Sequence, residues 1–585
     1  MPNLSPGVAA LIRLAPYFAV PLVVVYGPTN VGGYSLPWGC LMIAAIFATP
    51  CAYKITVYAQ RWKDVGAAGA LGAQAVPNIP ESSLSIIQHA GKALRVGYPG
   101  TTRLFDEYFA KYGNIFGVRI FTDTRIFTIE PEHVKAILTT QFDVFDKGAD
   151  IRWHMESMLG SGIFNADGDL WKFHRALTRP FFSRDRVSDL ENFLSHTKAA
   201  LNLAESHIAK GYAFDAQDLA SRYTLDCSTQ FLSGKDIQTL SAGLEHPSTS
   251  SQSTPAEYTT HPSNPFMKAL TEGLWLSANR ARLGPLWPLT EFRRDEVGLR
   301  RGVVDAYIEP ILLEALAARK GEKDEDGDDE TLLQSLCRQT QDIALIKDEI
   351  VNLLVAGRDS TASLITYSIY MLAENPNIAK RLQTEIIDRM GQKGQPTSVD
   401  IRELKYLRAF LDEVLRLYPP VPYGSREANR STLWPPATPG DKPFYIPAKS
   451  RILFSPWYMH RRTDLWGPDA HTFDPDRFLD ERLHKYLTPN PYIFVPFNAG
   501  PRTCIGQQFA YHMASCFLIK LLQRFTNFRL AREAQPEASR PPADWAHSQD
   551  PRKAQEKVSP AMHIVLYVKG GLWVKMDEAK QLDED

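Results

Sequence analysis

The stretch Phe497–Ala510 reads FNAGPRTCIGQQFA and holds a single cysteine, Cys504, between Gly500 and Gly506. The residues that follow, Gln507–Arg524, carry apolar side chains at helical spacing, which predicts a helix. A cysteine just before a helix start lies where free backbone N–H groups and the helix dipole favour a thiolate over a thiol. Glycines let the backbone approach a flat ligand without an intervening Cβ. The stretch therefore suits a thiolate that binds a metal inside a large planar cofactor.

The composition indicates a large folded chain with no general attraction to nucleic acid. The chain has 585 residues, of which 44% are hydrophobic and 22% charged, and its net charge is −1. This length allows about two to four domains, or one large mixed domain. The absence of a basic surplus argues against nucleic acid as a partner. The six cysteines lie far apart without zinc-type spacing, which favours a reducing compartment with free thiols.

The cysteine stretch resembles the haem-binding loop of the haem-thiolate monooxygenases, the cytochromes P450. The family pattern is Phe-x-x-Gly-x-Arg-x-Cys-x-Gly, and Phe497, Gly500, Arg502, Cys504 and Gly506 fill every fixed place. The resemblance implies that Cys504 binds the iron of haem b and that Phe497, Arg502 and Gly506 lie against the haem. A buried structural cysteine beside a glycine-rich turn is the alternative, and the motifs below weigh against it.

A second motif lies well ahead of the cysteine. Trp171 and Arg175 are four residues apart, so in a helix they share one face. Their indole N–H and guanidinium could hold a carboxylate between them. Alone, such a pair is more often a core tryptophan with a solvated arginine, but its position matches the family's Trp-x-x-x-Arg, which holds a haem propionate. The resemblance adds Arg426 as a further propionate contact.

Asp348–Leu372 predicts one long buried helix that contains the sequence AGRDST from position 356. A glycine inside a helix costs about 1 kcal/mol relative to alanine, so it calls for a reason. Small Ala356 and Gly357 would leave room for dioxygen above a metal. Asp359 and Ser360 would then supply an acid and a hydroxyl for proton delivery. The alternative is a polar patch on a buried helix.

This helix resembles the oxygen-activation motif of the family, with one departure. The family's first threonine is Ser360 here, and Thr361 stands in the second place. Threonine is restricted at χ1, whereas serine can also bond back to a carbonyl one turn earlier. Which of the two hydroxyls takes part in proton delivery is therefore open.

A third motif is an ionic trio. Glu413 and Arg416 are an i, i+3 pair on the amphipathic helix predicted over Ile401–Leu417, and Arg477 lies downstream in FDPDRF. The family joins a Glu-x-x-Arg helix to an arginine of this kind. The resemblance implies that the trio locks the chain beneath the haem, a structural role.

The amino-terminal part is strongly apolar. No charged residue occurs from Leu14 to Tyr53, and two apolar blocks, Leu14–Tyr26 and Leu36–Tyr53, lie in this window. The second block approaches the roughly 20 residues that a membrane-crossing helix needs. A cleaved signal peptide is the alternative, but no basic run precedes the first block. Whether one or two helices cross is open, and the basic residues that follow favour a cytosolic body.

We expect a mainly α fold with a minor β region, the cytochrome P450 haem-thiolate fold, preceded by an N-terminal membrane anchor. Residues 1–60 would form the anchor, and 61–585 the monooxygenase domain, with a flexible insertion at about 241–265. Smaller expectations are a pocket-lining loop at Phe142–Gly162, a helical lid at Phe266–Arg282 and Arg294–Arg319, a hairpin of Phe444–Ile446 with Arg451–Phe454, and a closing hairpin of Met562–Val568 with Leu572–Val574.

The resemblance implies a monooxygenase that inserts one oxygen atom of dioxygen into a C–H bond of an apolar substrate. Electrons would come from NADPH through a separate flavoprotein reductase, with cytochrome b5 as a further donor, at the endoplasmic reticulum membrane with the catalytic domain on the cytosolic side. The motif wording is most similar to fungal alkane and fatty-acid hydroxylases. It predicts a long-chain alkane, a fatty acid or an alkyl or polycyclic aromatic substrate.

Two other functions share the cysteine loop. A haem-thiolate isomerase or dehydratase needs no reductase, but it also has no need of Asp359 beside a hydroxyl. A non-catalytic haem sensor would keep Cys504 and show no NADPH-dependent turnover.

Overall fold

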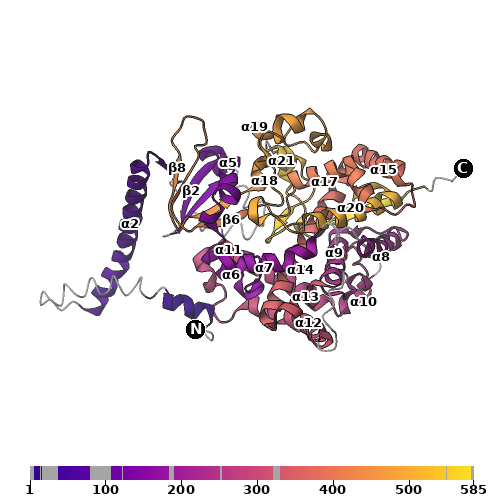
Figure 1. The fold of residues 1–585 in the computed structure, drawn as a ribbon, viewed down its shortest axis with the longest axis horizontal. Helices are drawn as coiled ribbons and strands as arrows, with labels where there is room; N and C mark the ends of the chain where they lie inside the picture. The colour runs from indigo at the N-terminus through magenta and orange to yellow at the C-terminus, as the bar shows by residue number, and fades with distance from the viewer. Residues whose placement is uncertain are drawn as a thin grey trace.

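The computed structural model describes residues 5–13, 15, 37–79, 107–120, 123–183, 190–250, 253–319, 330–548 and 550–580. Helices make up most of the body, and several strands gather on the side nearest the long amino-terminal helix (Figure 1). The mainly helical fold with a minor β region is as the sequence predicts.

The helices differ greatly in length. They are α2 (Trp38–Ala70), α5 (Pro131–Lys135), α6 (Ala149–Leu159), α7 (Gly168–Thr178), α8 (Glu191–Ile208), α9 (Ala216–Ser233), α10 (Ala256–Thr260), α11 (Asn264–Leu283), α12 (Glu296–Arg319), α13 (Leu332–Gln339), α14 (Ile343–Glu374), α15 (Pro376–Met390), α16 (Ser398–Glu403), α17 (Lys405–Leu417), α18 (Pro456–Met459), α19 (Thr463–Trp466), α20 (Gln507–Arg524) and α21 (Pro551–Gln555).

The strands that the structure describes form four sheets. The largest has the order β2 (Ile115–Ile120), β3 (Asp123–Thr128), β9 (Arg451–Phe454), β6 (Gly424–Ala428) and β4 (Phe145–Asp146). Two three-stranded sheets join β1 (Gln74–Ala75), β8 (Phe444–Ile446) and β7 (Thr432–Trp434), and β10 (Phe525–Leu530), β13 (Trp573–Glu578) and β5 (Phe214–Asp215). The last pairs β11 (Pro560–Met562) with β12 (Leu566–Val568).

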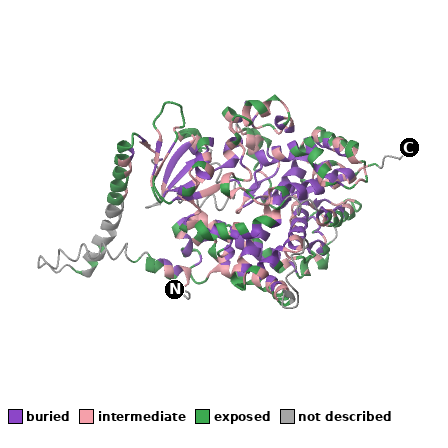
Figure 2. Ribbon diagram, in the orientation of Figure 1, coloured by how far each residue is buried: buried purple, intermediate pink, exposed green. Residues whose placement is uncertain are grey.

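The core is built around α14, which packs against α9, α17 and α20. Asp342 caps its first turn by accepting from the backbone N–H groups of Ala344 and Leu345, at 3.0 and 3.1 Å. Its side chains are buried on nearly all sides, as a helix that is apolar all round requires. Figure 2 shows this burial concentrated inside the body, whereas the described part of α2 is largely exposed.

The pairing of several strands differs from the sequence prediction. Phe444–Ile446 and Arg451–Phe454 have the predicted bounds but form no hairpin, because both edges of β9 are occupied by β3 and β6. Strand β8 instead lies between β1 and β7. The predicted closing hairpin is also wrong: β12 pairs with β11, and β13 joins β10 and β5.

Two helical segments differ as well. Phe142–Gly162, expected as a loop, contains the helix α6. Gly148 and Gly160 flank α6 with positive φ values of 87° and 54°, a conformation that favours glycine. They mark the two ends of α6. The helix predicted over Ile401–Leu417 is divided into α16 and α17 at Leu404.

The insertion at 241–265 has contacts with the body where the structure describes it. The Tyr258 ring lies 4.8 Å from the guanidinium of Arg222 on α9. Ser241 Oγ and His261 Nε2 are 2.9 Å apart, which ties the two ends of the segment together.

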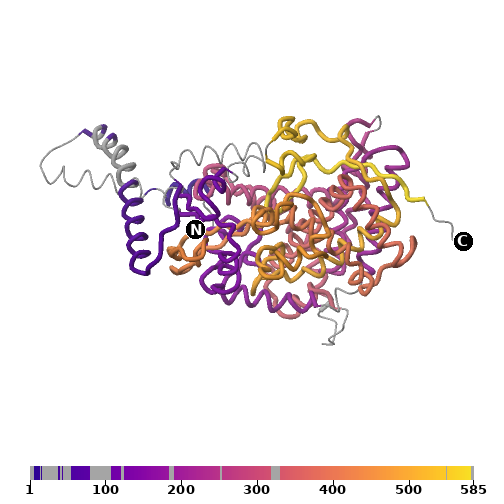
Figure 3. The backbone as a smooth tube through the Cα atoms, turned by 90° about the horizontal axis from the view of Figure 1, so that it is seen from above, coloured from indigo at the N-terminus to yellow at the C-terminus, as the bar shows by residue number. Residues whose placement is uncertain are grey.

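The amino-terminal region reaches the body at two places. Helix α2 stands beside the strands nearest the amino terminus (Figure 3). Arg119 Nη1 on β2 donates to the Val57 carbonyl of α2 at 3.2 Å. Residues 6–13 are helical, and the Gly7 N–H donates to the Phe292 carbonyl at 3.3 Å. The Arg13 guanidinium lies 4.7 Å from the Trp153 ring centre.

Across the ranges that the structure describes, no helix combines the length and the apolar character that a membrane span needs. Most of the first apolar block, Leu14–Tyr26, lies outside those ranges. The second block, Leu36–Tyr53, falls largely in the first half of α2. The predicted anchor over residues 1–60 therefore stays a prediction.

Candidate active site

The cysteine loop ends directly at the start of α20. Gly500 takes a positive φ of 65°, and a Cβ there would lie 2.0 Å from the Leu138 carbonyl oxygen, so only glycine fits. The Cys504 N–H donates to the Phe497 carbonyl at 3.0 Å, which closes the loop.

Cys504 is exposed, yet desolvation by the surrounding protein raises the pKa of its thiol. The two observations agree if the sulfur faces a recess that water reaches and protein encloses. The Gly506 N–H and the Arg175 guanidinium act in the opposite direction and favour the thiolate. A metal cation at the sulfur would favour the thiolate far more strongly.

Three buried or enclosed cations lie together near this loop. Burial lowers the pKa of Arg426 to about 10, and the neighbouring charge of Arg502 adds to this. Burial likewise lowers the pKa of the half-buried Lys147 to about 7, helped by Arg426 and Arg502. Asp167 accepts from Arg502 Nη2 at 2.8 Å. The Nε atoms of Arg426 and Arg502 are buried and have no hydrogen-bond partner among the described residues.

This cluster has more positive charge than the protein around it neutralises. Buried charges are stable only when they are paired, so the unpaired guanidinium nitrogens indicate an anionic ligand. A group with two carboxylates would supply the missing acceptors.

Trp171 and Arg175 border the same region, on α7. The Trp171 ring is buried and lies under both guanidinium groups, 4.5 Å from Arg502 and 5.7 Å from Arg175. Arg175 Nη2 donates to the carbonyl of Thr503 at 3.1 Å, which connects α7 to the cysteine loop. The structure thus brings together four predicted cofactor-binding residues: Trp171, Arg175, Arg426 and Arg502.

The middle of α14 has a distinct patch. Between residues 349 and 372 every residue is buried except Ala356, Gly357, Asp359 and Ser360, which are half-buried. A half-exposed patch on an otherwise buried helix marks an open space beside it. Together with the exposed sulfur and the unpaired cations, it fits haem held between α14 and the cysteine loop.

Side chains in this patch do not all face that space. A Cβ on Gly357 would lie 2.8 Å from Ser228 Oγ on α9, so close helix packing itself calls for glycine there. The Ser360 hydroxyl donates back to the Ala356 carbonyl at 2.5 Å. Thr361 is buried. Asp359 Oδ1 lies 3.1 Å from Arg358 Nη1 on the same helix.

The ionic trio is fully buried beneath this region. Glu413 accepts from Arg416 Nε and Nη2 at 2.6 and 2.7 Å, and Arg477 Nε lies 3.6 Å from Glu413 Oε1. Arg416 Nη1 also donates to the carbonyls of His460 and Ala470, at 2.7 and 2.6 Å. The trio therefore fastens the end of α17 to the segment that leads to the cysteine loop.

Sequence reasoning missed Asp167 and Lys147. Asp167 accepts from the backbone N–H of Lys147 at 2.8 Å and from Arg152 Nη1 at 2.9 Å, in addition to Arg502. Its position at the N-cap of α7 is a signal that the sequence does contain, since aspartate favours that place. For Lys147 the sequence holds no comparable signal, because its surroundings come from distant segments.

Comparison with known proteins identifies the family of this chain. The family model described as Cytochrome P450 matches residues 83–554. The cytochrome P450 monooxygenase himC of Aspergillus japonicus is 35% identical over 440 residues, covering 74% of this chain and 73% of its own length. Cytochrome P450 52E1 of Candida apicola is 34% identical, covering 69% and 76%. Cytochrome P450 52A3-A of Candida maltosa is 32% identical, covering 75% and 82%.

The chain belongs to the cytochrome P450 family. It is a monooxygenase, an oxidoreductase of the haem-iron type that depends on a redox partner for electrons. Haem, when bound, supplies the iron at which dioxygen is activated. The residues that fit it are Cys504 for the metal and the cationic cluster with Trp171 for its carboxylates.

Proposed function

We propose that this monooxygenase hydroxylates long-chain apolar substrates: alkanes, fatty acids or alkyl and polycyclic aromatics. Support comes from the sequences of its two core motifs, AGRDST from position 356 and FNAGPRTCIGQQFA from position 497, which are most similar to those of fungal alkane and fatty-acid hydroxylases. The lid helices α11 and α12 agree with this, because most of their buried side chains are apolar, among them Phe266, Met267, Leu270 and Val304.

Each site residue has a proposed role. Cys504 binds the iron of haem b as a thiolate. Trp171, Arg175, Arg426 and Arg502 hold the propionates, and the observation that carries this assignment is the pair of unpaired buried Nε atoms on Arg426 and Arg502. Packing against the haem falls to four residues: Phe497, Gly506, Ala356 and Gly357. The trio of Glu413, Arg416 and Arg477 keeps the underlying segment in place.

Proton delivery is assigned to Asp359 with a neighbouring hydroxyl. The back-bond from Ser360 to the Ala356 carbonyl occupies the Ser360 proton in the structure. Ser360 has to rotate to donate elsewhere, whereas Asp359 keeps one carboxylate oxygen without a hydrogen-bond partner among the described residues. We therefore assign the acid that donates the proton to Asp359. The neighbouring hydroxyl is that of Ser360 or of Thr361.

The proposed partners are an NADPH-dependent flavoprotein reductase and cytochrome b5. The proposed location is the endoplasmic reticulum membrane, with residues 1–60 as the anchor and the catalytic domain in the cytosol. The uncharged stretch from Leu14 to Tyr53 and the basic residues after it support this arrangement.

Product analysis tests the proposal. Membranes that contain the protein and a reductase are offered alkanes, fatty acids and polycyclic aromatics, with Cys504→Ala as the control. We expect NADPH-dependent hydroxylated products of a long-chain substrate, absent in the control. Products formed without NADPH would instead indicate an isomerase or dehydratase, and turnover of none of the panel would refute the substrate class.

A further inference from the structure

Asp359 is held in an unusual way. Arg358 Nη1 lies 3.1 Å from Asp359 Oδ1, and the two side chains are 7% and 10% exposed. The other oxygen, Oδ2, is buried without a hydrogen-bond partner among the described residues. The carboxylate is thus fixed through one oxygen and leaves the second available.

The Arg358–Asp359 contact needs an external support. Consecutive residues on a helix point in directions about 100° apart, so their side chains do not face one another. The Arg358 side chain must bend along the helix to reach Asp359. The contact with α9 does not hold the Arg358 side chain. Thr224 Oγ1 on α9 donates to the Arg358 backbone carbonyl, at 3.1 Å, and this bond leaves the guanidinium unaffected.

The support comes from the lid. Arg358 Nη1, the atom that contacts Asp359, also donates to Thr271 Oγ1 on α11 at 3.2 Å. Thr271 therefore holds the guanidinium over the carboxylate. The arrangement forms a continuous connection from the lid helix α11, through Arg358, to the acid on α14.

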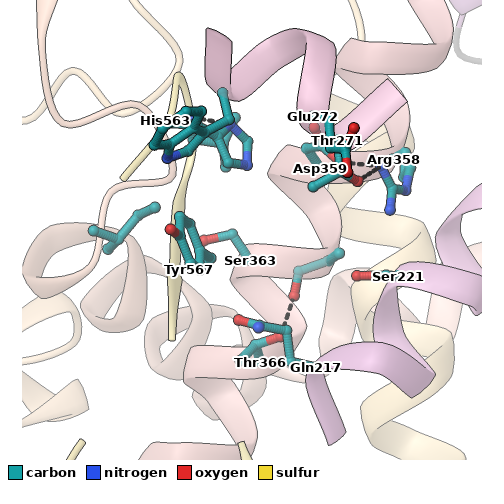
Figure 4. A pocket seen from close by; sticks show the side chains of 14 residues that line it. Gln217, Ser221, Thr271, Glu272, Arg358, Asp359, Ser363, Thr366, His563 and Tyr567 are labelled. Carbon is teal, nitrogen blue, oxygen red and sulfur yellow. Dashed lines mark hydrogen bonds and ion pairs between the residues drawn. The ribbon is translucent and has the colours of Figure 1, made fainter. Parts of the chain in front are cut away.

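The connection borders a cavity of about 290 Å³ between α9, α11, α14 and the turn after β11 (Figure 4). Among its lining residues, the charged or titratable ones are Glu272 from α11, Arg358 and Asp359 from α14, and His563 and Tyr567 from the β11–β12 hairpin; α9 contributes the neutral Gln217 and Ser221. Glu272 lies 3.3 Å from Arg300 and is paired away from Asp359. Among these residues, Arg358 is the one whose positive charge contacts the Asp359 carboxylate.

We infer that Thr271 and Arg358 are positioning residues that make the orientation of Asp359 depend on the position of the lid helix. The inference rests on the proposed role of Asp359 as the proton-delivering acid. With α11 in place, the Asp359 carboxylate is fixed and its Oδ2 stays available. When α11 moves away, the guanidinium loses its support and the carboxylate loses its partner. Proton delivery is then well positioned only while the lid covers the substrate.

The test compares Thr271→Val, which keeps the shape and removes the hydroxyl, with Thr271→Ser, which restores it. Glu272→Gln, the next residue on α11 and also in the cavity wall, is the matched control. The measurements are product formed per NADPH consumed and, without reductase, the dissociation constant of the substrate. Loss of one hydrogen bond predicts about a fivefold fall in coupling for Thr271→Val. We expect substrate affinity to be unchanged, and Thr271→Ser and Glu272→Gln to behave as wild type.

Hydrogen exchange of α14 peptides gives a readout that is independent of turnover. We expect faster exchange around Arg358 in Thr271→Val than in Thr271→Ser. Full coupling in Thr271→Val, or a parallel loss of substrate affinity, would overturn the inference. Asp359→Asn distinguishes failure of this inference from failure of the proposed role of Asp359. If Asp359→Asn uncouples the enzyme while Thr271→Val does not, only the inference fails. If Asp359→Asn stays coupled, the proposed role of Asp359 fails and the inference with it.

Discussion

Removal of the negative charge of Glu413 should destabilise the whole chain. Glu413→Gln keeps the shape of the side chain but leaves Arg416, which is 0% exposed, without a charged partner among the described residues, whereas Arg477 keeps its ion pair with Asp469 at 3.0 Å. Breaking a buried ion pair from one side costs about 3–5 kcal/mol. The carbonyls that accept from Arg416 remain, so we expect the lower part of this range. That is a large fraction of the roughly 5–15 kcal/mol by which proteins are stable.

The assay is the free energy of unfolding from urea titration, followed by circular dichroism. Asp476→Asn is the control, because its ion pair with Arg381 has a similar distance, 2.7 Å, but side chains that are 38% and 53% exposed. An exposed pair of this kind contributes about 0–1 kcal/mol. If Glu413→Gln costs no more than Asp476→Asn, the buried trio does not stabilise the fold as argued.

Three further predictions concern single residues. Cys504→Ala should lose the carbon-monoxide absorption band typical of thiolate-bound haem, and survival of that band would show that another ligand binds the iron. Ser360→Thr should raise product formed per NADPH, because threonine is restricted at χ1 and holds its hydroxyl in fewer orientations than serine does; peroxide release should fall, and equal release in both proteins would contradict this. Burial raises the pKa of Glu556 to about 7 from its usual 4.5, so the folded state binds the proton more tightly and stability falls as pH rises from about 4.5 to 7. Glu556→Gln should therefore be more stable than wild type at pH 8, by on the order of 3 kcal/mol, and equal to it near pH 4.5, as measured by melting temperature; the same difference at both pH values would refute the assignment.

Local signals in the sequence predict much of this molecule. Helix α20 begins and ends where apolar periodicity after Gly506 places it, and the two lid helices match their predicted ranges to within a few residues. The partners of β8 and β9 could not be predicted, because adjacent strands with a short connection usually form a hairpin. Here the pairing is decided by β3 and β1, which are more than 300 residues away in the chain.

In the candidate site, too, residues in local motifs could be predicted, whereas residues that act through distant contacts could not. Motif residues such as Cys504 and Arg426 could be identified from spacing and resemblance. Lys147 and Thr271 could not, because each acts through a contact with a residue far away in the sequence. The sequence could not choose between Ser360 and Thr361 as the proton-delivering hydroxyl, and the structure adds only that the Ser360 hydroxyl bonds back to the Ala356 carbonyl.

The contact of residues 6–13 with the body has a consequence for topology. Gly7 bonds to Phe292 of the body, and α2 is joined to the body again at Val57. Both ends of the intervening chain are therefore attached to the same folded body, and a bilayer cannot pass through that body. If the chain between them enters a membrane while these contacts hold, it must leave by the face through which it came. The number of crossings is then even, and a single-span anchor would require the Gly7 contact to be given up.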